Sequence, residues 1–170
     1  MILSLVTPSD PILHTKVEPL KFPLNRDEID IDQVIQDMFE TMYNFKGIGL
    51  SANQVGLPYR MFVMGTPDIE MVFLNPRIVS VDGEEVVAEE GCLSYPGMFI
   101  KVKRPSEVVI RSTNTSGETK TQTYTGMTAR VVLHEMDHLD GINYQKRATR
   151  FHLEQARNQH KKLQRKIKRG

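Results

Sequence analysis

The sequence of 170 residues has little of the three features that would point to secretion or to a membrane. It contains one cysteine, Cys92, so an internal disulfide framework is excluded. No apolar run approaches the ~20 residues that a helix needs to cross a bilayer. The first fifteen residues carry no Lys or Arg and soon reach Pro8, unlike a signal or transit peptide. We therefore expect a cytoplasmic protein without a membrane partner.

What the sequence does have is the composition of an ordinary globular protein, with 39% hydrophobic and 25% charged residues. Its length is that of one domain. The net charge of +1 conceals an asymmetry, because residues 146–170 contain ten Lys or Arg and one Glu. Residues 1–145 contain twelve basic and twenty acidic residues. The two parts are therefore expected to prefer different neighbours.

Hydrophobic periodicity and turn residues divide the chain into helices and strands. The first helical pattern can be capped by Asp27 or Asp30 and ended by Gly47. Turn signals at residues 65–68 and at Asn75-Pro76 break the following β pattern into short segments. The predicted helices are residues 27–46, 127–139 and 149–168. The predicted β segments lie within residues 59–80, 98–112 and 118–125.

The stretch HEMDH, residues 134–138, places two imidazoles and a carboxylate on one predicted helix. His134 and His138 are four residues apart, so they share a helix face about 5–6 Å apart at Cβ and could bind one metal ion. In the H-E-x-x-H arrangement, Glu135 takes a proton from metal-bound water. The alternative is a surface helix that happens to carry two histidines. Val131 and Met136 disfavour it, since they belong to an apolar face that is typical of a core.

A site of this kind needs a third protein ligand, and the sequence offers several sources. Tyr144 stands where a metzincin would have its third histidine. Glu154 follows His138 by only sixteen residues and lies in the basic terminal helix, which fits a thermolysin-like site poorly. Cys92, in EGCLS at residues 90–94, could be a core thiol, a nucleophile or a ligand. Beside an H-E-x-x-H helix the ligand reading is favoured, and one thiolate with two imidazoles suits zinc or ferrous iron.

Three motifs now stand in order along the chain: GIGLSANQ at 47–54, EGCLS at 90–94 and HEMDH at 134–138. The first alone would read as a helix-ending turn. Together they resemble the three signature motifs of the peptide deformylase family, over at least residues 28–144. The resemblance implies a hydrolase that removes the N-formyl group from the initiator methionine of nascent polypeptides and releases formate. It also implies an α+β fold, with antiparallel β segments around a central metal-binding helix and the two other helices outside.

The resemblance assigns roles to individual residues. Cys92, His134 and His138 would bind one divalent metal ion, Fe²⁺ in the cell and Zn²⁺, Ni²⁺ or Co²⁺ in purified protein. Glu135 would act as general base and then general acid as metal-bound water attacks the formyl carbon. The Gln54 amide and the backbone N–H of Leu93 would stabilise the developing oxyanion.

Other residues of the motifs would bind the substrate. Gly47 and Gly49 would let the backbone pass close to the peptide, and the main chains of Ile48 and Gly91 would bind it in an extended form. The methionine side chain needs an apolar pocket. We expect its walls to come from Ile48, Met127, Val131 and the aliphatic part of Glu90.

Two positions depart from the common family pattern. Ser51 replaces an alanine that is common in the first motif, and Leu133 precedes the first histidine where glutamine is frequent. The mechanism assigns chemistry to neither position. Asp137, inside HEMDH, is expected by analogy to pair with Arg104.

The basic C-terminal helix has two interpretations. In one, residues 149–170 belong to the same domain as the deformylase catalytic domain, residues 1–148, and dock on its acidic surface. The docking residues would be Leu153, Ala156, Leu163 and Ile167. In the other, the helix is an arm that binds ribosomal RNA. We expect neither DNA nor a membrane as a partner. Two functional alternatives to a deformylase are a zincin-type endopeptidase and an inactive binding module. An inactive module would lack at least one catalytic group, whereas Gln54, Cys92, His134, Glu135 and His138 are all present in the sequence.

Overall fold

A computed structural model describes residues 1–168 of the chain; the last two residues of the predicted 149–170 segment lie outside this part. Within it, three α-helices and a five-stranded antiparallel sheet form an α+β fold, as expected. The helices are α1 (Ile31–Asn44), α2 (Gly126–Leu139) and α3 (Arg150–Ile167), with 3-10 turns η1 (Pro11–His14), η2 (Ala52–Val55) and η3 (Tyr144–Arg147). The strands, neighbours in chain order, are β1 (Gly49–Ser51), β2 (Met61–Thr66), β3 (Ile69–Glu90), β4 (Ile100–Thr113) and β5 (Thr119–Thr125).

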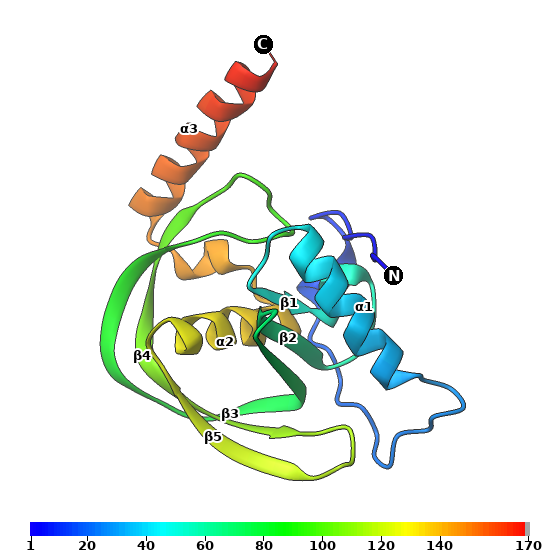
Figure 1. The fold of residues 1–170 in the computed structure, drawn as a ribbon. Helices are drawn as coiled ribbons and strands as arrows, with labels where there is room; N and C mark the ends of the chain where they lie inside the picture. The colour runs from blue at the N-terminus through cyan, green and yellow to red at the C-terminus, as the bar shows by residue number, and fades with distance from the viewer. Residues whose placement is uncertain (169–170) are drawn as a thin grey trace.

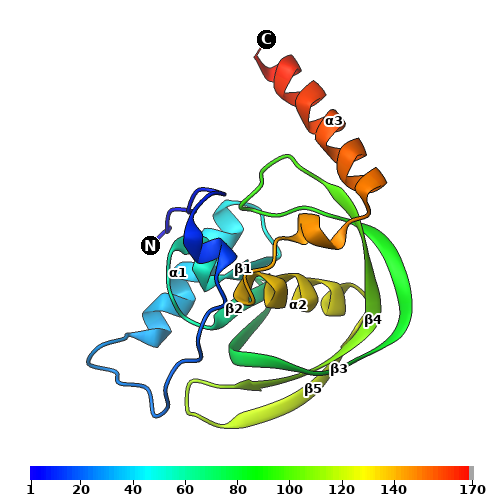
Figure 2. The same cartoon turned by 180° about the vertical axis from the view of Figure 1, so that it is seen from behind.

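The sheet curves around α2 and separates it from α1. Figure 1 shows the long strands β3 and β4 bending around α2, with α1 beyond β1 and β2, and Figure 2 shows the same arrangement from behind. Strand β2 is buried on both faces. Phe62 and Met64 pack in one cluster with α2, and Met61 and Val63 pack in another with α1. The alternation of side chains along one strand therefore joins two hydrophobic cores.

Helix α2 is the most enclosed element of the fold. Every residue from Ala129 to Leu139 is buried, although three of the last six are His134, Glu135 and His138. At its end, Gly141 adopts φ 69°, and a Cβ there would lie 2.8 Å from the carbonyl carbon of His14. Only glycine fits this close turn, which ends the helix near the predicted position.

Strand β3 differs from the prediction of short segments. It runs unbroken from Ile69 to Glu90, and the predicted break at Asn75-Pro76 is wrong. The pairing with β4 instead shifts in register between Leu74 and Arg77, so the proline lies at an irregularity that costs no ladder hydrogen bond. Asn75 adopts φ 47°, and its side-chain amide bonds both backbone polar groups of Leu20 at 2.7 Å.

Helix α1 starts later than predicted, and helix α3 docks over less of its length. Asp30, the second of the two candidate caps, accepts from the backbone N–H of Gln33. In α3, Ala156 is buried, but Leu163 is 44% and Ile167 64% exposed. His160 still contacts the body, with Nδ1 3.1 Å from the carbonyl oxygen of Gly97, and Leu163 lies beside the same glycine. The expected docking is therefore wrong only for Ile167, near the end of α3, where the helix extends away from the body (Figure 1). Over residues 1–168, none of the helices is long and apolar enough to span a membrane.

Candidate functional site

The second and third motifs meet where β3 ends against the side of α2. Cys92 follows β3 by two residues, and its thiol lies 3.2 Å from Nε2 of His138. One ligand atom from each of Cys92, His134 and His138 lies within 4.8 Å of the others. A sulfur and two imidazole nitrogens this close match the donors of tetrahedral zinc and ferrous sites, so the residues fit a divalent metal ion.

The orientation of His134 is fixed by Glu90. Nδ1 of His134 lies 3.0 Å from Oε2 of Glu90, so Nδ1–H donates to the carboxylate and Nε2 is left for a metal. The rings of His134 and His138 are 5.0 Å apart at their centroids and inclined by 71°. Both histidines are buried, and the two rings therefore present their nitrogens from a rigid helix.

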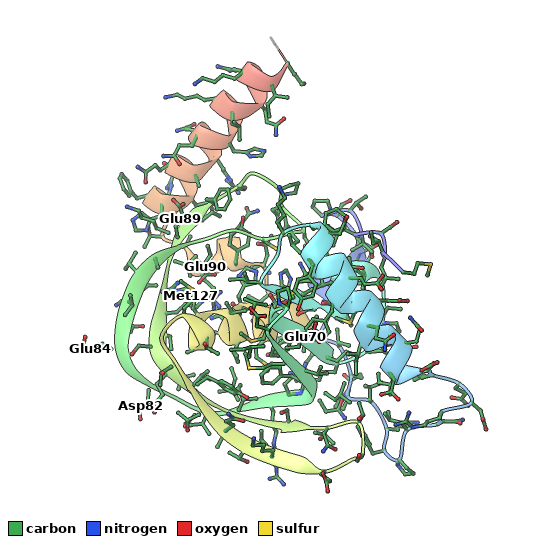
Figure 3. All side chains as sticks on the ribbon, viewed as in Figure 1. Glu70, Asp82, Glu84, Glu89, Glu90 and Met127 are labelled. Carbon is green, nitrogen blue, oxygen red and sulfur yellow. The ribbon has the colours of Figure 1, made fainter. Side chains whose placement is uncertain are left out.

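Glu90 is the centre of a buried ion network. Arg104 donates to its two oxygens at 2.7 and 2.9 Å, and Nη1 of Arg130 donates to Oε1 at 2.7 Å. Arg104 also donates to Asp137 at 2.8 Å, which confirms the expected pair, and Arg147 donates to the same carboxylate. In Figure 3, Glu90 lies on the inner side of β3, whereas Asp82 and Glu84 lie on the outer side. Glu90 lines the cavity as expected, and its carboxylate also accepts a hydrogen bond from His134, a candidate metal ligand.

The environments of these groups shift their pKa values in different directions. Burial would raise the pKa of Glu90, but hydrogen bonds from His134 and Arg104 lower it to about 2. Burial would lower the pKa of His134, whereas hydrogen bonds to Cys92 and Glu90 raise it to about 10. Burial takes the pKa of His138 well below its ordinary value. In the metal-free chain one imidazole thus holds a proton that a metal ion must displace.

Glu135 lies beside the three candidate ligands and is 4% exposed. Burial raises the pKa of its carboxyl group, against the charge of His134 and a hydrogen bond from Ser51. A carboxyl group with a raised pKa can accept and return protons near neutral pH. A Cβ at Gly49 would lie 2.5 Å from Oε1 of Glu135, so the carboxylate can occupy this position only because residue 49 is glycine.

Gln54, from η2, points its side-chain amide toward the thiol of Cys92. Its Oε1 accepts from the backbone N–H of Ser51 at 2.9 Å, and its Nε2 donates to Oγ of Ser94 at 3.0 Å. Nε2 also lies 3.7 Å from Sγ of Cys92. The amide is therefore held with its donor side toward the candidate ligands.

A cavity of about 580 Å³ opens in front of these groups. Ile48 (54% exposed) and Met127 (63%) lie at its rim, and Val131 is buried in its wall. Gly47 also lines the cavity and packs closely on Leu93, since a Cβ at residue 47 would lie 2.7 Å from Cδ1 of Leu93. The cavity brings together twelve residues singled out in the sequence: Gly47, Ile48, Gly49, Gln54, Glu90, Gly91, Cys92, Leu93, Met127, Val131, His134 and Glu135.

Several side chains at the site were missed in the sequence. Phe45 and Phe99 line the cavity from just outside α1 and β4, although the sequence placed them within the predicted helix 27–46 and the β segment 98–112, where nothing marked them as site residues. Arg130 had a visible signal, because a charged residue in the middle of an apolar helix needs a buried partner. Ser51 was assigned no chemistry, yet its hydroxyl lies 2.7 Å from Oε2 of Glu135.

Comparisons with known proteins agree with this geometry. The chain matches the family model of polypeptide deformylase over residues 2–154. It is 41% identical over 134 residues to a peptide deformylase of Thermotoga petrophila, covering 78% of this chain and 79% of that protein. It is 44% identical over 148 residues to one of Chlorobaculum parvum, covering 83% and 76%. The crystal structure of a peptide deformylase from Synechococcus elongatus in complex with actinonin is similar with a TM-score of 0.84 and 31% identity, covering 93% of this chain and 85% of that one.

The match to the family model includes all three motifs and the elements that carry them. The chain therefore belongs to the polypeptide deformylase family, metallohydrolases that remove the N-formyl group from nascent peptides.

Proposed function

We propose that the cavity binds the formyl-methionyl end of a nascent polypeptide and hydrolyses its formyl amide to formate and a free amine. One observation carries this proposal: Glu135 and Gln54 line one cavity together with Cys92 and His134, and His138 completes the ligand cluster with these last two residues. A divalent ion bound by that cluster would polarise the formyl carbonyl and acidify water. The donors suit Fe²⁺, which we propose for the cell, and Zn²⁺, Ni²⁺ or Co²⁺ in purified protein.

Glu135 is the proton carrier of the reaction. Its carboxylate takes a proton from the attacking water as the C–O bond forms, and gives a proton to the amine as the C–N bond breaks. Its buried position and its raised pKa support this role. Atoms and protons balance: the water oxygen becomes part of formate, one water proton passes through Glu135 to the leaving nitrogen, and the other is the acidic proton of formic acid, which ionises to formate.

Gln54 and the backbone N–H of Leu93 donate to the formyl oxygen as it gains negative charge. The support is the fixed direction of the Gln54 amide, whose Oε1 is occupied by Ser51 so that Nε2 faces the cavity. Donors that are already oriented need no reorganisation when the charge develops.

The methionine side chain enters the apolar part of the cavity between Ile48, Met127 and Val131. The peptide extends along the main chains near Ile48 and Gly91, which both line the cavity. Strand β1 starts at Gly49 and forms the edge of the sheet, where an extended peptide can add as a further strand.

The test is formate release from a short formyl-methionyl peptide by protein prepared without oxygen and loaded with Fe²⁺ or Ni²⁺. We expect steady turnover, and none with the Glu135→Gln variant at equal metal content. The acetyl-methionyl peptide is the matched control substrate. A zincin-type endopeptidase would instead cleave unformylated peptides internally and tolerate Cys92→Ser, and that result would overturn the proposal.

The basic helix α3 supports a second partner, the large ribosomal subunit, in the cytoplasm where nascent chains emerge. Its C-terminal end extends from the body with Arg165 and Lys166 in its last turn. Residues 1–148 and 149–170 form one domain in this proposal, because Ala156 is buried against the body. Binding to large subunits should fall steeply with salt and be lost without residues 149–170. Equal binding by the truncated protein would contradict the arm.

A further inference from the structure

Ser51 occupies a position between the first motif and the proton carrier. It ends β1 and precedes η2, and it is fully buried. Its Oγ lies 2.7 Å from Oε2 and 3.1 Å from the backbone oxygen of Glu135, a residue 84 positions away. In the family motif an alanine is common here, so nothing in the motif itself assigns this hydroxyl a function.

The hydroxyl has one hydrogen, and the shorter distance identifies its acceptor as Oε2 of Glu135. A bond from a neutral donor to a carboxylate is charge-assisted and stronger than an ordinary hydrogen bond. Oε2 is thereby held beside Ser51, at the buried end of β1, while Oε1 lies close to Gly49 at the other end of the strand. Gly49 and Glu135 both line the cavity, so Oε1 is the oxygen on the side of the substrate.

The backbone of Ser51 acts on a different group. Its N–H donates to Oε1 of Gln54, which directs the Gln54 amide into the cavity. Substitution of the side chain leaves this backbone bond in place, although it removes the capping-box contact between the Ser51 side chain and the backbone N–H of Gln54. The effect of the hydroxyl on Glu135 can therefore be measured while the side-chain amide of Gln54 keeps its own restraint.

We propose that Ser51 is a positioning residue whose hydroxyl holds Oε2 of Glu135, so that Oε1 takes the proton from water and returns it to the amine. The proposal rests on the proposed deformylation. With Oε2 occupied, the same oxygen handles the proton in both half-reactions. The carboxylate then need not rotate between the attack of water on the formyl carbon and the cleavage of the C–N bond.

A purely structural role for the hydroxyl predicts that its removal lowers stability without changing kcat. The bond also ties η2 to α2, and its loss could lower stability alone. Three variants separate the two roles: Ser51→Ala removes the hydroxyl, and Ser51→Cys fills the same space with a weak donor. The matched control, Thr41→Val, removes a buried hydroxyl from α1, where it donates to the backbone carbonyl oxygen of Asp37.

Positioning predicts that Ser51→Ala and Ser51→Cys lower kcat about tenfold or more, with KM within about twofold and metal content unchanged. Thr41→Val should lower the unfolding midpoint and leave kcat as in the wild type. If the wild type turns over and both Ser51 variants keep its kcat, positioning is overturned and the deformylase function stands.

Two measurements judge the same inference without turnover. In metal-free protein, Ser51→Ala should shift the urea midpoint less in a Glu135→Ala background than in the wild type, because the bond partner is already gone. A crystal structure of Ser51→Ala should show the Glu135 carboxylate turned from its place beside β1. Equal midpoint shifts together with an unmoved carboxylate would overturn the inference. A wild type that releases no formate would overturn the proposed function, and these two measurements would then decide whether Ser51 orients the carboxylate.

Discussion

Glu90 shows why a buried charge is present at this site. Taking a carboxylate out of water is costly, and a buried ion pair by itself is weak support for stability. Here the carboxylate also receives the Nδ1–H of His134 and so fixes which nitrogen of that ring faces a metal. Arg104 and Arg130 neutralise the charge that this task requires. The ion network therefore fixes the orientation of His134 at the cost of desolvating buried charges.

Replacement of Arg104 by alanine should destabilise the protein by about 3 kcal/mol, because it removes one partner from two buried carboxylates. The value lies at the lower end for such losses, since Arg130 and Arg147 remain beside Glu90 and Asp137. Urea unfolding of the metal-free protein measures the change. Arg150→Ala is the control: its pair with Glu154 is exposed and should contribute less than about 0.5 kcal/mol. Equal midpoints for both variants would contradict this assignment.

The pKa of Glu90 predicts an acid-dependent contribution to stability. The folded-state pKa is about 2 and the ordinary value is 4.5, so on acidification the unfolded chain binds the proton first. The contribution is complete above the ordinary value and is lost as the pH falls toward the folded-state value. We expect the stability difference between wild type and Glu90→Gln to narrow by about 3 kcal/mol from about pH 5 to about pH 2. Parallel stability curves of the two metal-free proteins would show that Glu90 is not responsible.

The sequence predicted the residues of the site better than their connections. His134, Glu135 and His138 follow from helical spacing alone, and Cys92 follows from the need for a third ligand. Ser51 could not be found in this way, because a hydrogen bond across 84 positions leaves no local pattern. Its distance from Glu135 is set by the packing of β1 against α2, which only the fold defines.

At the scale of elements, β3 shows where local signals fail. Asn75-Pro76 is a strong turn signal, and residues 81–90 are too polar to read as a buried strand. Pairing with β4 nevertheless continues to Glu90 opposite Ile100. Long-range pairing outweighed local propensity, because the sheet accepts a proline at a register shift. Helix α2 followed the prediction closely, since its spacing and Gly141 act locally.

Helix α3 should respond to substitution unequally along its length. Ala156→Glu places a charge in the apolar cluster with Met98, Ile100 and Tyr144, and should cost about 3 kcal/mol and free the helix from the body. Ile167→Glu adds the same charge at an exposed position and should change stability by less than about 0.5 kcal/mol. Urea unfolding and the rate of trypsin cleavage within α3 measure both effects. Similar results for the two variants would contradict docking that ends before Ile167.

At the scale of the whole molecule, the candidate ligands link parts that are far apart in the chain. Cys92 follows β3, and both histidines belong to α2. An ion held by all three would cross-link the outer hairpin to the central helix and bind only the folded state.

Metal binding should therefore raise the free energy of unfolding, by about 2.7 kcal/mol when free metal reaches a hundred times its dissociation constant. Thermal unfolding with and without added Ni²⁺, after treatment with a chelator, measures this effect. The Cys92→Ala variant should lose most of the increase. The Fe²⁺ form should also lose activity in air while the Ni²⁺ form keeps it, because oxidation attacks the iron and the thiolate. An unfolding temperature that is independent of metal in the wild type would contradict the cross-link.

The root of α3 and the candidate thiol share one apolar cluster. Ala156, Met98 and Tyr144 are buried in it, and Cys92 packs against it. The ring of Tyr144 also lies 5.5 Å from that of His134. The root of α3 is thus one side-chain layer from the candidate ligands, while the C-terminal end of the helix extends from the body. A force on the C-terminal end of α3 would be transmitted to the same side chains that pack against the thiol of Cys92. The position of α3 and the geometry of the candidate ligands are therefore mechanically connected.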